Sequence, residues 1–166
     1  MPTLQFVNED ARIVALAVAY HLGRPGSETD PDTLKRHSIG LASVDAMLTP
    51  FLGQARIDLD LTPYQIHRLD EALLGVTNEL KAYEMAERRS TVLGFGDRLS
   101  GLFPELAAGG AEDASALDLV ERVVMLHRRL TSSVREANAS LQAECDAAAE
   151  AAAAAKQARR WWQFWR

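Results

Sequence analysis

Apolar residues recur at alternating intervals of three and four positions in two stretches of the chain, near residues 63–90 and 115–141. This spacing gathers the apolar side chains into one narrow stripe along a helix, as in a coiled coil. Because the two stripes share the same rhythm, we expect the two helices to pack as an antiparallel hairpin along one seam. The predicted seam residues are Ile66, Leu69, Leu73, Val76, Leu80, Tyr83, Leu119, Val123, Leu126 and Leu130.

Both helices of the predicted hairpin follow a recognisable capping sequence. Thr62 precedes Pro63, a residue type favoured at the first helical position, and Gln65 stands three residues after Thr62. Ser115 or Asp113 is the expected cap before the second stripe, and Asp118 completes a capping box with Ser115. We therefore expect each helix to begin directly after its cap.

Two short segments alternate apolar and polar residues, a pattern typical of a β-strand with one buried face. They lie at residues 3–7 and 56–61. We expect them to pair as a two-stranded ribbon. Since such a ribbon is only marginally stable alone, helices must cover its apolar face.

The remaining apolar segments of the first half predict two more helices. One lies near residues 9–22, with Asn8 as its expected N-cap. The other lies near residues 31–52, where Gly40 and Pro50 predict a kink or a break. The expected fold is mainly α: a helical bundle with a long antiparallel helical hairpin, a minor two-stranded β ribbon and an extended C-terminal helix.

Beyond Leu141 the apolar stripe gives way to alanine, and neither glycine nor proline occurs between Cys145 and Arg166. Alanine has the highest helix propensity but buries little surface, so this composition is typical of a helical spacer. We therefore divide the chain into a helical body at 1–141, an alanine-rich spacer at 142–155 and a tail at 156–166.

The tail contains every tryptophan of the chain, together with four cations and no acid. On a helix that advances about 100° per residue, its four large aromatic residues fall in one arc about 160° wide, opposite its arginines. Tryptophan and arginine together suit a surface that is apolar on one side and anionic on the other, either a membrane interface or a complementary protein groove. The predicted docking residues are Lys156, Arg159, Arg160, Trp161, Trp162, Phe164, Trp165 and Arg166.

The distribution of charge and cysteine bears on partners and location. The net charge of −5 includes +4 from the tail, so the rest of the chain carries −9 (−5 minus +4), which disfavours nucleic-acid binding by the body. The single cysteine excludes an internal disulfide and favours a reducing compartment. The longest apolar run, near residues 13–22, is shorter than the roughly 20 residues that span a bilayer. We expect a cytoplasmic protein, with peripheral attachment at the inner membrane face.

Residue types with catalytic potential form no recognisable constellation in the sequence. None of the four histidines belongs to an HExxH or ExxH pair, and Cys145 has no histidine nearby. The GxG at residues 94–96 has no preceding strand and no third glycine. Asp58 and Asp60 fit the solvent face of a strand better than a catalytic pair. No catalytic residue, metal or cofactor is predicted.

The preferred hypothesis is a non-enzymatic adaptor or assembly protein. Its helices would bind a protein partner or further copies of the chain, and its tail would dock on a membrane surface or a larger assembly. One alternative is a structural subunit of a phage-like or secretion particle, with the tail in a protein groove. Another is a small helical enzyme with a site near Tyr20, His21, His67 and Asp70. In a further interpretation, the tail aromatics fold back onto the body.

Overall fold

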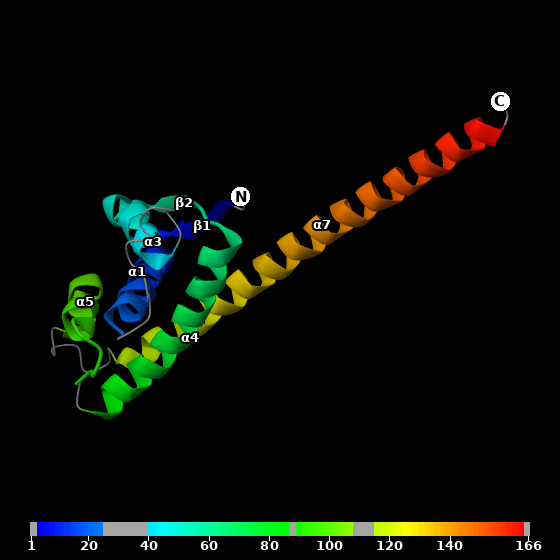
Figure 1. Cartoon of the computed structure of the whole chain (residues 1–166). Coiled ribbons are helices and arrows are strands. Elements are labelled where there is room, and N and C mark those ends of the chain that lie inside the picture. The colour runs from blue at the N-terminus through cyan, green and yellow to red at the C-terminus, as the bar shows by residue number, and fades with distance from the viewer. Residues whose placement is uncertain (1–2, 25–39, 87–88, 108–114, 165–166) are drawn as a thin grey trace. The chain divides into compact units, whose positions relative to one another are not determined.

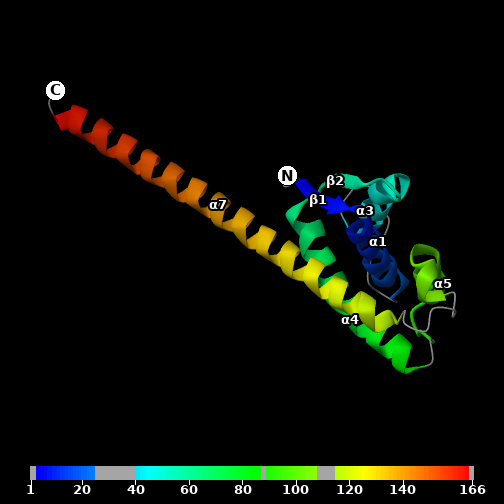
Figure 2. The same ribbon diagram turned by 180° about the vertical axis from the view of Figure 1, so that it is seen from behind.

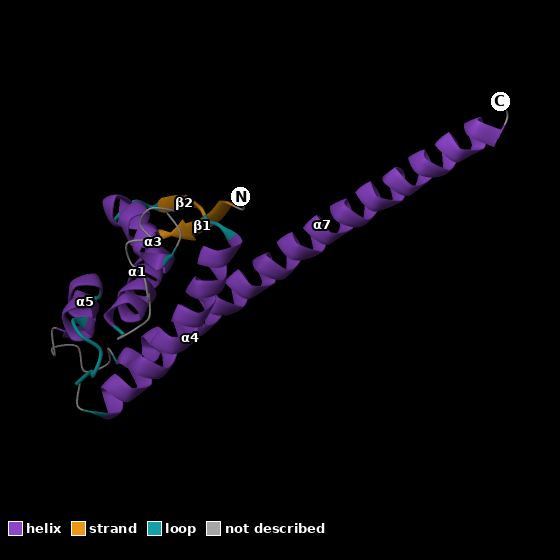
Figure 3. Cartoon of the chain, in the orientation of Figure 1, coloured by secondary structure: helices purple, strands orange, loops and turns teal. Residues whose placement is uncertain are grey.

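Helices dominate the described part of the chain, and its one sheet is a two-stranded antiparallel ribbon (Figures 1 and 3). The computed structural model describes residues 3–24, 40–86, 89–107 and 115–164, with side chains as far as residue 147 except at 136, 137, 140, 141, 144 and 145. The predicted mainly α fold with a minor β ribbon is confirmed. The elements are β1 (Thr3–Val7), α1 (Asn8–Gly23), α3 (Leu41–Leu48), the 3₁₀ helix η1 (Thr49–Phe51), β2 (Arg56–Asp60), α4 (Pro63–Met85), α5 (Phe95–Leu102), α6 (Pro104–Ala107) and α7 (Ala116–Phe164).

The chain divides into a first unit, Met1–Leu130, and a second unit, Thr131–Arg166. All elements from β1 to α6 belong to the first unit, together with the first four turns of α7. The second unit contains the rest of α7. Each unit is described separately below.

The ribbon pairs β1 with β2 in a register that runs from Thr3 opposite Asp60 to Val7 opposite Arg56. Residues on one face of β2 are buried and those on the other are exposed, as the alternation in the sequence predicts. On the exposed face, the Thr3 hydroxyl donates to Asp60 over 2.6 Å and the Gln5 amide donates to Asp58 over 3.1 Å. Both aspartates are thus occupied in cross-strand pairing.

Helix α1 is the central element of the first unit and packs against α3, α4 and α5. Every residue from Ile13 to Val18 is at most 1% exposed, because apolar residues surround the helix. The prediction that Asn8 caps this helix is wrong. Asn8 is the first helical residue, and Val7 occupies the cap position without a side-chain hydrogen bond. Strand β1 runs directly into α1, so the extended last residue of the strand takes the place of a separate cap.

The segments between the longer elements contain short helices. In place of the helix predicted near residues 31–52, the described part contains α3 followed by η1, and residues 31–39 lie outside it. The segment after α4 forms α5 and α6, two short helices that the sequence pattern does not predict. Gly94 precedes α5 in the left-handed region, with φ 71°, where glycine is favoured.

The hairpin consists of α4 and the first turns of α7, which lie side by side (Figures 1 and 2). The Ala116 amide donates to Glu84 over 3.3 Å, and His127 lies 3.0 Å from Asp70, so the two helices run antiparallel. At the start of α4, Thr62 and Gln65 exchange the hydrogen bonds of a capping box, as predicted. Nine of the ten predicted seam residues are buried, and Tyr83 is half-buried.

The second unit is helical from Thr131 to Phe164, without a break at the predicted start of the spacer. Its described side chains near the spacer are exposed, among them Gln142, whose amide donates to Asp146 over 2.9 Å. This i,i+4 contact lies on the helix surface. In the described chain, no helix combines the length and apolarity needed to cross a bilayer.

Candidate docking surface

Helix α7 carries the predicted docking tail on its last turns. The backbone of residues 156–164 is helical, so the periodicity inferred from the sequence applies to these positions. Positions 161, 162 and 164 then share one arc of the helix and positions 159 and 160 lie outside it, at about 100° per residue. Trp165 and Arg166, also predicted to dock, lie outside the described residues.

A dense set of hydrogen bonds fixes the beginning of α7 in the first unit. Asp118 accepts from the amide of Ser115 over 3.1 Å, and the Ser115 hydroxyl accepts from the Leu117 amide over 3.1 Å. Glu84 of α4 accepts from the next free amide, that of Ala116. Amides at a helix start have no partner within the helix, so these contacts define where α7 begins.

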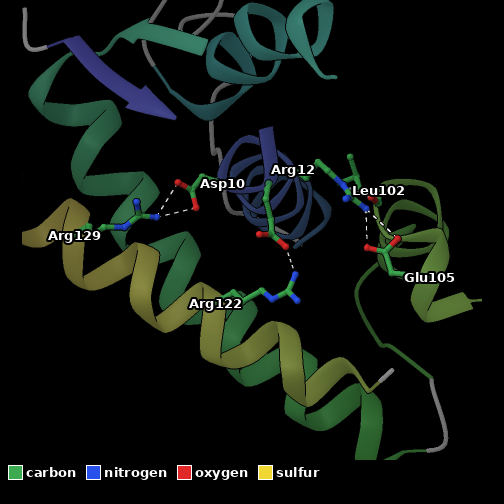
Figure 4. Close-up of polar contacts among 7 residues, drawn as sticks. Asp10, Arg12, Leu102, Glu105, Arg122 and Arg129 are labelled. Carbon is green, nitrogen blue, oxygen red and sulfur yellow. Dashed lines mark hydrogen bonds and ion pairs between the residues drawn. The ribbon is translucent and has the colours of Figure 1, made fainter. Parts of the chain in front are cut away.

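Two arginines of α7 bind the first turn of α1 (Figure 4). One nitrogen of Arg129 lies 2.8 Å from each carboxylate oxygen of Asp10, which is 8% exposed. Arg122 pairs with Glu9, and both partners of this pair are about half exposed. Carboxylates in the first turn also interact favourably with the helix dipole of α1. The buried Asp10 makes the Arg129 pair the more important of the two, because losing its partner leaves a desolvated charge.

A third arginine, Arg12, joins α1 to α5 and α6, and sequence reasoning missed it. Its Nε donates to the carbonyl of Leu102, and its Nη2 lies 3.0 and 3.2 Å from the two carboxylate oxygens of Glu105 (Figure 4). The guanidinium also lies 4.3 Å from the ring centroid of Phe103, within cation–π distance. The available signal was a single arginine within an otherwise apolar stretch of helix, which implies a specific partner.

The residues nominated for an enzyme site have different neighbours in the structure. His21 Nε2 lies 3.1 Å from Arg68, Asp70 pairs with His127, and the exposed His67 lies 3.7 Å from a glutamate one turn along α4.

Tyr20, the fourth nominated residue, has a packing role. Its ring makes an edge contact with Phe95, at 6.2 Å between centroids. A Cβ atom added at Gly75 would lie 2.4 Å from Tyr20 Cε1. Glycine at position 75 therefore allows α4 to approach this ring more closely than a residue with a side chain would.

Among the residues whose structure is described, no three His, Cys, Asp or Glu side chains are grouped so that they could hold a metal ion. No protein-family model matches the chain, and neither a curated protein nor a solved structure matches it. The docking role of the tail is therefore argued from the helices, ion pairs and charges of this chain alone.

Proposed function

We propose that this protein is a non-enzymatic adaptor or assembly component that attaches through its C-terminal tail to an anionic membrane surface. The observation that carries the proposal is the continuity of α7, which begins in the hairpin at Ala116 and remains helical to Phe164. A helix that is packed and ion-paired at its start and cationic and aromatic at its end suits a docking role. The proposal includes a cytoplasmic location at the inner membrane face.

The composition of the tail supports reversible attachment. Each large aromatic side chain contributes about 1.5–3 kcal/mol when fully buried, and each cation about 1 kcal/mol near anionic lipid. The four aromatics and four cations of residues 156–166 thus provide a substantial gross attraction. Partial burial and the ordering of side chains reduce it, so we expect binding at the interface without insertion across the bilayer.

Vesicle flotation tests this function. We expect the intact chain to float with anionic vesicles, and a chain that ends at residue 155 to bind at least about tenfold less. A second variant replaces Trp161, Trp162 and Trp165 with alanine and keeps every charge. If apolar contact is required, this variant also loses flotation. If the cations contribute, electroneutral vesicles bind the intact chain more weakly than anionic vesicles do. Equal flotation of the intact and truncated chains, or flotation of neither, contradicts the membrane proposal.

A protein groove is the second candidate, because a helix with aromatic and arginine residues is a common hot-spot composition. The helical backbone of residues 156–164 is the observation that favours it. In this case the truncation abolishes co-purification with a defined partner subunit, while neither form floats with vesicles. A tail that binds neither lipid nor protein contradicts both candidates.

A further inference from the structure

Large apolar side chains are exposed where α4 finishes and α7 begins, and on the segment that follows α4. Met85 is 86% exposed, Leu93 87% and Leu117 50%. The contact between Glu84 and the Ala116 amide brings the first and third of these to the same end. The ring contact of Tyr83 with Phe95, at 5.9 Å, holds the segment that follows Leu93 beside α4. Exposed apolar side chains concentrated at one place indicate an interaction surface.

This end of the hairpin also carries an excess of acidic residues. Of the residues described here, 115–121 contain two acids and no base, and 79–86 with 89–90 contain two acids and two bases, so together they sum to −2 (−2 plus 0). Asp118 and Glu121 are exposed on the first turns of α7. We call Met85, Leu93, Leu117, Asp118 and Glu121 the hairpin end. Its charge is opposite to the +4 of the tail.

We infer that the hairpin end of one copy is the docking site for the tail of a second copy. The inference rests on the docking role proposed for the tail and names a partner for it. Aromatic residues of the tail match the exposed apolar side chains, and its cations match Asp118 and Glu121. A second copy is a suitable occupant because every copy of the chain carries both the cationic, aromatic tail and the acidic, apolar hairpin end.

Such a contact joins two different surfaces, so it is heterologous and leaves one tail and one hairpin end free in every pair. Repetition of the contact gives open chains or a closed ring. All three tryptophans lie in the tail, so tryptophan emission reports on the tail without labelling. We expect a blue shift of the emission with rising protein concentration, in step with an increase in mass by sedimentation.

Full-length variants test the surface. Leu117→Lys with Glu121→Lys makes the hairpin end less apolar and more positive, and we expect self-association to weaken at least about tenfold. Met85→Lys with Leu93→Lys changes two almost fully exposed residues and serves if the first variant does not fold. Leu74→Lys with Glu71→Lys is the matched control, because it makes the same charge change at exposed residues of α4 that lie well before Met85. The control should associate like the original chain.

Mixing gives the decisive result. A chain that ends at residue 155 keeps the hairpin end, and the Leu117→Lys, Glu121→Lys chain keeps the tail. Each alone should be monomeric, and the mixture should form a one-to-one complex with blue-shifted emission. A protein that is monomeric at all concentrations, or associates equally well with either surface altered, contradicts the inference, as does a concentration-independent blue shift. Vesicle flotation of the double variant separates the two proposals, since loss of self-association with retained flotation leaves the membrane function standing.

Discussion

Helix α7 has two segments of unequal length, residues 116–130 (its first half, in the first unit) and 131–164 (its second half), which form one helix but differ in what stabilises them. From Ala116 to Leu130 the helix buries four seam leucines and valines and makes ion pairs with α1 and α4. From residue 131 onward the described side chains are half-buried or exposed, and alanine dominates the sequence. Tertiary packing supports the first half, whereas intrinsic propensity supports the second. Different interactions can therefore stabilise different parts of one continuous helix, and the two halves of α7 should respond differently to substitution.

The largest expected effect follows from removing a seam side chain. Leu126 is 3% exposed, so Leu126→Ala should lower the free energy of unfolding of the first unit by about 2–5 kcal/mol through lost burial and a residual cavity. Gln142→Ala, at an exposed position of the second half, should leave that value within about 0.5 kcal/mol. Denaturant titration followed by circular dichroism measures both. Similar losses of unfolding free energy for the two variants would contradict the view that tertiary packing stabilises only the first half of α7.

An intermediate effect is expected for the ion pairs that hold the first half. Arg129→Ala should cost about 1–3 kcal/mol, because it leaves the carboxylate of Asp10 largely buried without this partner. Arg122→Ala should cost no more than about 1 kcal/mol, since its pair with Glu9 is exposed to solvent. The same titrations rank the two, preferably at low salt. If Arg122→Ala lowered the free energy of unfolding more than Arg129→Ala, burial of the carboxylate would not determine which ion pair stabilises the fold more.

The smallest effect on the first unit should come from breaking the second half. Ala152→Pro removes a helical hydrogen bond and costs about 3 kcal/mol of local helix stability. We expect less helical circular dichroism and an unchanged unfolding midpoint for the first unit. Ala152→Ser, which keeps the amide, is the control and should preserve most of the helical signal. A shifted midpoint would show that the halves depend on each other for stability.

The parts of the fold that local sequence determines were predictable. The spacing of Ile66, Leu69 and Leu73 indicated a helix with one buried stripe, and the side chains of Thr62 and Gln65 indicated its start. The alternation of apolar and polar residues predicted both strands, because a period of two places the apolar side chains on one face of a strand.

The remaining features depend on residues far apart in the sequence. Arg12 finds Leu102 and Glu105 some 90 positions away, which no local pattern reveals. Helix α5 depends on burying Phe95 and Leu99 against its neighbours, so its eight residues give a weak signal alone. The tail was evident from composition, but the hairpin end was not. The exposure of Met85 and Leu93 is a property of the folded chain that the spacing of apolar residues does not reveal.

The close approach of Gly75 to the Tyr20 ring limits which residues can occupy position 75 in relatives of this chain. Exposed positions such as that of Gln142 accept many residue types, so they diverge quickly between relatives. At position 75 the Cβ of any other residue would clash with the ring of Tyr20, which is 9% exposed, unless the ring or a helix moved. Distant relatives of this chain should therefore keep a glycine in the middle of the helix that follows the second strand, opposite an aromatic residue near the end of the first helix, after most other similarity has been lost.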